Sequence, residues 1–328
     1  MTRAGVPEAA DAAERPAIGV DIGGTKITAG LVAPWGDVLD TASCPTPAGS
    51  ARDTEDAVVA VVAELTGRAG PPAGIGVGAA GWFDPTGDAV LFSPHLAWRD
   101  EPVRGRLAAR LDGPLWVGND ADAAAWGEHR FGAARGADLA LMVTLGTGIG
   151  GGIVHRGRLL RGAHGVAGEW GHARVVPDGR PCPCGNRGCW EQYASGTALA
   201  ATAREAVVRD PAAARALLDR AGGAPELLTG EHVAEVAAAG DPLAAALIED
   251  VGAWLGQGLA DLSAVLDPDV VVIGGGMSRL GELLLAPARA RLEQSLPGRG
   301  FRPGPRVVAA ELGPAAGLIG AADLARST

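Results

Sequence analysis

The chain contains almost no lysine: of its 28 basic residues, all but Lys26 are arginine. Acidic residues number 38, which gives a formal net charge of −10, and no segment of the sequence concentrates positive charge. A positive face that binds nucleic acid or an anionic membrane is therefore not expected. Lys26 lies in the segment DIGGTK (21–26). Either a compact ammonium is required at this position, or the one remaining lysine lies there by chance.

Long apolar runs and a secretory signal are also missing. No apolar run reaches the roughly 18 residues that a membrane helix requires. The first 16 residues lack the apolar core of a signal peptide. We therefore expect residues 1–16 to form a disordered tail and the protein to be cytoplasmic, with no membrane partner.

Cysteine is scarce, with four residues in 328, and three of them follow the spacing C-x-C-x4-C at Cys182, Cys184 and Cys189. His172 precedes this cluster. Thiolates and an imidazole at short spacing are typical of a tetrahedral structural zinc site. The alternative, a disulfide, needs a C-x-C bridge of awkward geometry or leaves an odd cysteine. Cys44 stands apart and is interpreted as a small hydrophobic residue.

Glu169 and Glu191 flank the cysteine cluster. Carboxylates beside an exposed loop are usually only solvated. A loop fixed by a metal holds its side chains still, so both carboxylates are candidates to bind a polar ligand.

The hydrophobic patterning predicts an α/β protein. The length and a hydrophobic content of 47% allow a sizeable core in one or two domains. Residues 17–40 and 139–160 each contain two apolar runs joined by a glycine-rich turn, as in β-hairpins. A third strand is expected near Val38. The other expected elements are strands at 74–81, 114–118, 269–278 and 306–312, a long loop at 81–100, and helices at 54–69, 102–111, from 119, 196–209, 231–239, 242–266, from about 281, and 314–325.

The two hairpins, each feeding further strands and helices, predict a duplicated α/β architecture with a cleft between its halves. This order differs from the repeated βαβ pattern of a Rossmann fold.

Three glycine-rich turns are candidate phosphate sites. DIGGTK (21–26), LGTGIGG (145–151) and IGGGMS (273–278) expose backbone amides that can approach phosphate oxygens closely. Each alone is compatible with an ordinary turn, but together they favour a nucleotide site. No GxxxxGK[ST] is present, which excludes a P-loop, and Asp21 can meet a phosphate-bound Mg²⁺ through water. The candidate nucleotide-binding residues are Asp21, Gly23, Gly24, Thr25, Lys26, Gly146, Thr147, Gly148, Gly274, Gly275 and Gly276.

Asn119 and Asp120 lie where an expected strand runs into a helix. Asp120 is either an ordinary helix N-cap or a general base that accepts a proton from a substrate hydroxyl, with Asn119 orienting the same substrate. Asp122 is interpreted as a first-turn carboxylate that interacts favourably with the helix dipole.

On these motifs the sequence resembles the ROK family (repressor, open reading frame, kinase), and within it the ATP-dependent glucokinases. The resemblance rests on LGTGIGGGIVHRGRLLRGAHGVAGEWGH (145–172), with DIGGTK, NDADAAAWGE, CPCGNRGCWEQYASG and IGGGMS in the family's order. It covers residues 17–325.

The resemblance implies an actin-like, hexokinase-type (ribonuclease H-like) fold of two α/β domains that close over a sugar. The implied domains are 17–118 with 313–328, and 119–312 with the zinc loop. The implied substrates are glucose and MgATP, and the implied assembly is a homodimer or homotetramer. The implied roles are catalytic base for Asp120, sugar binding for Gly81, Asn119, Asp120, Glu169, His172 and Glu191, and structural zinc binding for His172, Cys182, Cys184 and Cys189.

Some positions depart from the family's pattern. His95 stands where relatives often have asparagine, and an imidazole offers fewer donors. Trp82 and Phe83 are also unusual. Sugar identity is therefore open, with N-acetylmannosamine, fructose and allose as alternatives to glucose. Polyphosphate is an alternative donor, which the intact CPCGNRGC segment disfavours. A sugar-sensing repressor of the family would need a DNA-binding segment of about 60 residues, whereas only 20 residues, without net positive charge, precede Asp21.

Overall fold

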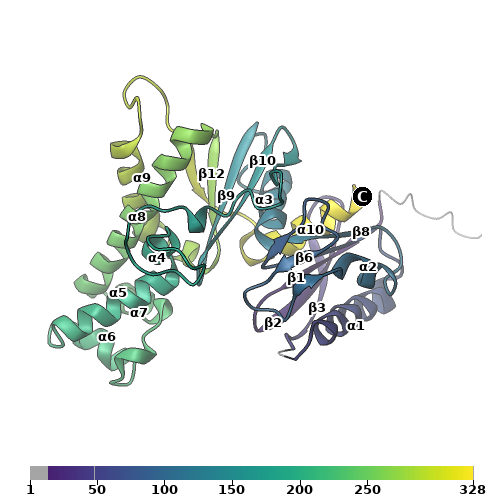
Figure 1. Ribbon diagram of the computed structural model, residues 1–328, viewed down its shortest axis with the longest axis horizontal. Helices are drawn as coiled ribbons and strands as arrows, with labels where there is room; N and C mark the ends of the chain where they lie inside the picture. Colours follow the sequence, from purple (N-terminus) through teal and green to yellow (C-terminus); the bar gives the residue numbers. More distant parts are fainter. Residues whose placement is uncertain (1–13, 48, 328) are drawn as a thin grey trace, which may run out of the picture. The chain divides into compact units, whose positions relative to one another are not determined.

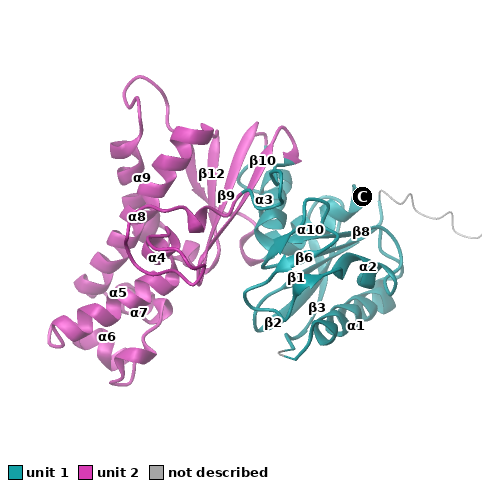
Figure 2. Cartoon of the chain, viewed as in Figure 1, with its two compact units in different colours: residues 1–135, 159–167, 315–328 teal, residues 136–158, 168–314 magenta. Residues whose placement is uncertain are grey.

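The computed structural model describes residues 14–47 and 49–327, which form two compact units (Figure 2). The first unit comprises the described residues up to 135, together with 159–167 and those from 315 onward. The second comprises 136–158 and 168–314. Most of the predicted tail lies outside the described residues. The boundary between the units differs from the expected domain boundary at 119. Residues 119–135 and 159–167 were expected in the second domain, but they pack with the first unit.

The first unit is built on a five-stranded sheet in the order β3-β2-β1-β4-β8. The hairpin β1–β2 is antiparallel, as is β2–β3, whereas β1–β4 and β4–β8 are parallel. Alternating apolar residues such as Ile18, Val20 and Ile22 are fully buried. The strands are β1 (Ala17–Ile22), β2 (Lys26–Val32), β3 (Val38–Pro45), β4 (Ile75–Ala79) and β8 (Leu115–Asn119), and the helices are α1 (Ala51–Ala69), α2 (Val103–Ala108), α3 (Asp120–Phe131) and α10 (Ala316–Arg326).

Glycines in two neighbouring strands allow helix α10 to lie directly on this sheet (Figure 1). A Cβ on Gly19 of β1 would come 1.8 Å from the carbonyl oxygen of Leu318, and one on Gly76 of β4 would come 1.8 Å from that of Ala321. No real Cβ tolerates such contacts. These glycines are therefore required by close packing, and α10 in turn packs against α3.

Residues 81–100, expected to be a loop, contain a small antiparallel sheet in the order β5-β6-β7. Its strands are two or three residues long, too short for an alternating pattern to be visible in the sequence. Phe83 and Trp98 are almost fully buried and hold this segment against the unit. The strands are β5 (Trp82–Phe83), β6 (Val90–Phe92) and β7 (Arg99–Glu101).

The second unit repeats the strand order of the first, as β11-β10-β9-β12-β13. Again an antiparallel hairpin, β9–β10, is followed by two parallel strands. The predicted fold class, a duplicated α/β architecture, is confirmed. The strands are β9 (Leu139–Leu145), β10 (Ile149–His155), β11 (Arg158–Leu159), β12 (Val270–Gly274) and β13 (Arg306–Ala309), and the helices are α4 (Glu191–Ala194), α5 (Gly196–Arg209), α6 (Arg215–Arg220), α7 (Gly230–Ala238), α8 (Pro242–Leu266) and α9 (Glu282–Ser295).

Helix ends follow local capping chemistry. Helix α1 starts earlier than expected because Ser50 and Asp53 form a capping box. Helix α8 ends as predicted at Asp267, which adopts φ 50°. Helices α4 and α6 were not expected. Among the described residues, no helix is both long and apolar enough to cross a membrane.

Candidate active site

The predicted site residues fall into two groups, one in each unit. In the first unit, Asp21 lies near the end of β1, before the turn that leads into β2. Thr46 fastens this turn: its hydroxyl donates to the carbonyl oxygen of Gly23 at 2.7 Å, and its N–H donates to that of Thr25 at 3.0 Å. Gly24, Thr25 and Lys26 remain exposed. The turn is thus held by its backbone while its outer amides are accessible.

Asn119, not Asp120, caps helix α3. Its Oδ1 accepts hydrogen bonds from the N–H groups of Ala121 at 2.8 Å and Asp122 at 3.0 Å. Its Nδ2 donates to the carbonyl oxygen of Gly81 at 3.1 Å. Asp120 is the first residue of the helix. The N-cap interpretation of Asp120 is wrong, and its half-buried carboxyl group is available for chemistry.

Gly81 could not be replaced by a larger residue. Its φ is 155°, and a Cβ would come 2.7 Å from the carbonyl oxygen of Phe92. The strand pairing of β5 with β6 thus fixes the backbone whose carbonyl oxygen Asn119 contacts.

Two neighbouring carboxyl groups of the first unit have raised pKa values. Burial raises the pKa of Asp120, against the opposing effects of backbone N–H groups and the nearby charge of His95. Burial, and then the negative charge of Asp120, raise the pKa of Asp21 to about 7. At neutral pH this region therefore resists holding two full negative charges. A raised pKa makes a carboxylate a stronger proton acceptor once it is ionised.

His95 is held near these groups by a rigid turn. The hydroxyl of Ser93 donates to the carbonyl oxygen of Ala80 at 2.7 Å and accepts from the N–H of Leu96 at 3.3 Å. A Cβ on Gly24 would lie 3.6 Å from that of His95. The imidazole is exposed beside the DIGGTK turn, so the residue that departs from the family pattern lies close to Asp120.

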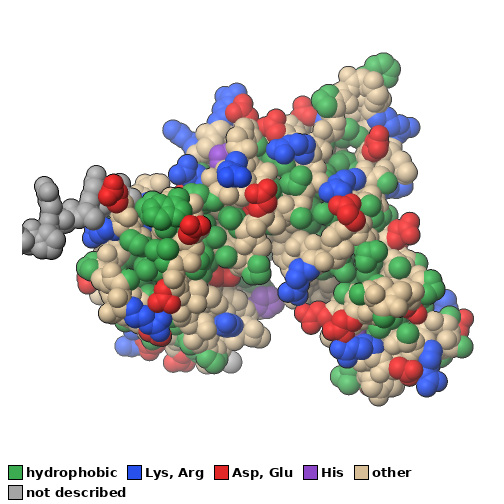
Figure 3. All heavy atoms as spheres, turned by 180° about the vertical axis from the view of Figure 1, so that it is seen from behind, with side chains coloured by type: hydrophobic (Ala, Val, Ile, Leu, Met, Phe, Trp, Pro, Cys, Tyr) green, Lys and Arg blue, Asp and Glu red, His purple; other side chains and the backbone are tan. Residues whose placement is uncertain are grey.

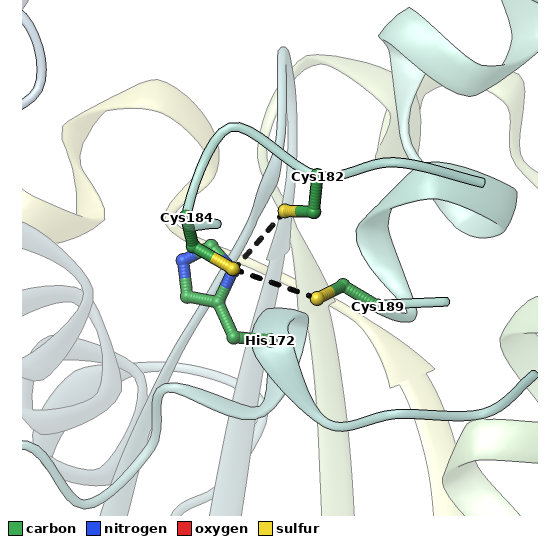
Figure 4. A group of neighbouring side chains, drawn as sticks. All are labelled: His172, Cys182, Cys184 and Cys189. Carbon is green, nitrogen blue, oxygen red and sulfur yellow. Dashed lines mark hydrogen bonds between the residues drawn. The ribbon is translucent and has the colours of Figure 1, made fainter. Parts of the chain in front are cut away.

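In the second unit the four predicted metal ligands come together (Figure 4). One ligand atom from each of His172, Cys182, Cys184 and Cys189 lies within 4.8 Å of all the others. The sulfurs of Cys184 and Cys189 are 3.6 Å apart, and Nδ1 of His172 is 3.8 Å from the sulfur of Cys182. Zn–S bonds of about 2.3 Å place tetrahedral ligands about 3.8 Å apart. The donor set and its spacing fit zinc.

The cysteine loop is anchored to helix α8. Trp190, directly after Cys189, is buried, and its Nε1 donates to the carbonyl oxygen of Trp254 at 2.8 Å. A Cβ on Gly258 would come 2.1 Å from the indole ring of Trp190. The loop is therefore braced by packing on one side and by the ligand cluster on the other.

Glu191 joins the ligand cluster to the second glycine-rich turn. Its Oε1 lies 3.1 Å from the sulfur of Cys182 and 3.6 Å from Nδ1 of His172. A Cβ on Gly148 would lie 2.7 Å from its Oε2. Glu169 Oε2 lies 4.0 Å from the other ring nitrogen of His172. The three predicted sugar ligands of this unit, Glu169, His172 and Glu191, are neighbours.

A cavity of about 800 Å³ opens beside the turn at Gly146. Its walls are mostly apolar and come from α5, α7 and the segment after β12. The starts of α5 and α7, at Gly196 and Gly230, reach it as well. Its lining residues are Gly146, Thr147, Gly196, Thr197, Leu199, Ala200, Arg204, Thr229, Gly230, Glu231, Ala234, Glu235, Ala238, Gly276, Met277, Arg279, Leu280 and Leu283.

Only part of the predicted nucleotide set of this unit lines the cavity. Gly146, Thr147 and Gly276 do so, whereas Gly148 faces Glu191. Gly274 is buried in β12, and a Cβ on Gly275 would come 2.4 Å from the carbonyl oxygen of Leu145. Neither of these two glycines lines the cavity, and close packing leaves no room for a Cβ at either position. The wall from α5 and α7 was not expected, although small residues beside the caps Ser195 and Thr229 are a sequence signal for helix starts.

The chain is similar to sugar kinases over nearly its whole length. The ROK family profile matches residues 17–328. A glucokinase of Streptomyces coelicolor is 45% identical over 312 residues, which cover 94% of this chain and 97% of that protein. A ROK family glucokinase from Streptomyces griseus, solved in complex with glucose and AMPPNP, is 47% identical with a TM-score of 0.87, covering 95% of this chain and 100% of that one. A ROK hexokinase from Thermus thermophilus is 34% identical, with a TM-score of 0.76 and coverages of 94% and 97%. The predicted family is confirmed: the chain belongs to the ROK family.

Proposed function

We propose that the protein is an ATP-dependent glucokinase, which transfers the γ-phosphoryl group of ATP to the 6-hydroxyl of glucose. The observation that carries the proposal is that Asn119, and not Asp120, caps helix α3. The amide caps α3, so the carboxyl group of Asp120 is left beside a rigid backbone as a candidate base. The glucokinase relatives, one of them bound to glucose and AMPPNP, support the same activity.

In the proposed reaction Asp120 accepts the proton of the 6-hydroxyl as that oxygen attacks the γ-phosphorus. A bond forms between O6 and phosphorus, the bond between phosphorus and the β–γ bridging oxygen breaks, and ADP leaves. A raised pKa makes the carboxylate a better proton acceptor. Positioning and electrostatic stabilisation supply most of the catalysis in such transfers.

The nucleotide is proposed to bind in the cavity beside Gly146, with its base against the apolar wall from α5 and α7. The volume suits a nucleotide-sized ligand. The amides of the glycine-rich turns are proposed to hold the phosphates, and Asp21 to face the accompanying Mg²⁺ through water.

Sugar-binding roles are proposed for Gly81, Asn119 and Asp120 in the first unit. The same kind of role is proposed for Glu169, His172 and Glu191 in the second unit. Zinc held by His172, Cys182, Cys184 and Cys189 would fix the loop and orient the imidazole. The metal then serves as a scaffold, while the reaction proceeds at Asp120. A cytoplasmic homodimer or homotetramer remains part of the proposal.

A kinase for another hexose is the second candidate, because the imidazole of His95 lies near Asp120. A DNA-binding role has less support, since acidic and basic side chains are interspersed on the face seen in Figure 3. The test is a coupled assay of glucose, N-acetylmannosamine, fructose, mannose and allose, with ATP or polyphosphate as donor. We expect the highest kcat/KM for glucose with ATP. Poor turnover of glucose relative to another hexose would refute the specificity.

A further inference from the structure

Arg161 lies in a segment that leaves the second unit and packs against the first. Residues 159–167 belong to the first unit, although the chain on both sides of them belongs to the second. The segment fits closely: Gly165 has φ 75°, and a Cβ there would come 2.1 Å from the carbonyl oxygen of Phe83. The carbonyl oxygen of Arg161 accepts a hydrogen bond from the N–H of Ala167 at 3.1 Å. The backbone around Arg161 is therefore held against the small sheet.

The guanidinium of Arg161 connects three parts of the first unit. Its Nη1 donates to the carbonyl oxygen of Pro85 at 3.1 Å, and its Nη2 donates to that of Asp84 at 3.3 Å. Its Nε lies 3.4 Å from Oδ2 of Asp122, and the two side chains are 15% and 4% exposed. Lysine could not replace this fork, because one ammonium cannot reach the carboxylate and both carbonyl oxygens together.

Asp122 belongs to the first turn of α3, which carries the proposed base. Its N–H is one of the two that Asn119 caps. The same asparagine reaches Gly81, which precedes β5 and the segment that Arg161 contacts. The contacts form a closed circuit: Arg161 to Asp122, Asp122 to Asn119, Asn119 to Gly81, and along the chain to Asp84.

We propose that Arg161 is a positioning residue for phosphoryl transfer: it clamps the first turn of α3 to the segment after β5 and so fixes Asp120 relative to Asn119 and Gly81. The inference rests on the proposed kinase activity. None of the contacts given above joins the half-buried Arg161 to Asp120 or to the cavity residues, so its effect on catalysis is proposed to act through this clamp. Small displacements of a catalytic group are costly, since about 1 Å can reduce the rate about 100-fold.

The test compares Arg161→Ala with Arg130→Ala. Arg130 is the matched control, because it lies on α3, the helix that carries Asp122, and its Nε is 3.0 Å from Oδ2 of the buried Asp323. Both variants are expected to lower Tm. Only Arg161→Ala is expected to lower kcat, by about 100-fold, with the KM for MgATP within about twofold of wild type. Equal kcat values in the two variants would overturn the positioning role.

A double variant separates the effect of Arg161 on kcat from its effect on stability. It also replaces Arg161→Ala in the test if that variant fails to fold. Asp122→Leu with Arg161→Met removes both charges and fills their volume, and such replacements of buried ion pairs are often neutral or stabilising. We expect Tm to recover while kcat stays low, since neither side chain holds Asp84 or Pro85. Recovery of kcat along with Tm would refute the clamp. An inactive wild-type protein in the same assay would instead refute the proposed kinase activity.

Discussion

The side-chain amide of Asn119 donates a hydrogen bond to the carbonyl oxygen of Gly81 at 3.1 Å. The oxygen of the same amide caps α3. One side chain thus joins the helix that carries the proposed base to the backbone ahead of β5, and its two ends have separable roles.

Substitution of Asn119 should separate capping from positioning. Asn119→Asp keeps an acceptor for the cap but loses the donor to Gly81 and adds a negative charge beside Asp120. Asn119→Ala loses both and should cost about 1 kcal/mol of unfolding free energy. We expect Asn119→Asp to be the more stable variant, while both lose at least about tenfold in kcat/KM for glucose. Denaturant unfolding and steady-state assays measure the two effects. Wild-type kcat/KM in Asn119→Asp would show that the amide donor is dispensable.

Replacing the proposed base should strongly reduce turnover without unfolding the protein. In Asp120→Asn the proton acceptor is gone, so we expect kcat to fall about 100- to 10,000-fold. Burial of the charged carboxylate is unfavourable, so the variant should be at least as stable as wild type at neutral pH. Glucose binding, measured by calorimetry, should change little. A turnover within tenfold of wild type would rule out Asp120 as the base.

Much of the fold is visible in the sequence because it depends on local signals. The Gly/Thr turns at 21–26 and 145–151 and the apolar runs beside them predict both hairpins, and their repetition predicts the shared strand order. The sheet at 82–101 is not visible, because its strands are held by the burial of Phe83 and Trp98, which is decided by distant parts of the chain.

The site was predictable where residues cluster in the sequence. His172 and the three cysteines lie within 18 positions, and the structure brings them together as predicted. The capping by Asn119 needed the geometry, since an asparagine and an aspartate are both good caps. The interpretation of Asp122 as a helix-dipole carboxylate omitted its partner: Arg161 is 39 positions away, and no local pattern predicts that contact.

Asp21 should make stability depend on pH. Its pKa of about 7 in the folded protein lies above the 3.8 of an ordinary aspartate. Between these values the folded protein holds a proton that the unfolded chain has released, so this group's contribution to the unfolding free energy falls as pH rises. Asp21→Asn removes that dependence.

The Tm advantage of Asp21→Asn over wild type should therefore be larger at about pH 8 than at about pH 4, by a few degrees. Asp40→Asn is the control, because Arg68 lowers the pKa of Asp40 and the sign of its effect is opposite. An advantage of Asp21→Asn that is equal at both pH values would contradict the raised pKa.

The cysteine cluster should bind about one equivalent of zinc. Removal of this zinc should weaken the binding of glucose more than that of ATP. Cys184→Ser or a chelator should lower Tm and raise the KM for glucose more than that for ATP, because Glu191 contacts the cluster. Cys44→Ser is the control, since Cys44 lies outside the cluster in the first unit. Less than about half an equivalent of zinc in protein with reduced cysteines would refute the metal site.

Filling the cavity of the second unit should block the nucleotide selectively. Ala234 lines this cavity from α7, whereas Ala239, at the end of the same helix, is exposed and does not line it. In Ala234→Trp the indole would occupy volume proposed for the base, so we expect the KM for ATP to rise at least tenfold, a loss of about 1.4 kcal/mol of binding. The KM for glucose should stay within about twofold, and Ala239→Trp should resemble wild type in both. The two variants add the same side chain at the same helix, so a general destabilisation of α7 would raise the KM for ATP in both variants.

A rise in the KM for ATP that is confined to Ala234→Trp would locate the nucleotide base against α7. Unchanged ATP kinetics in Ala234→Trp would exclude this wall as the binding site of the nucleotide base.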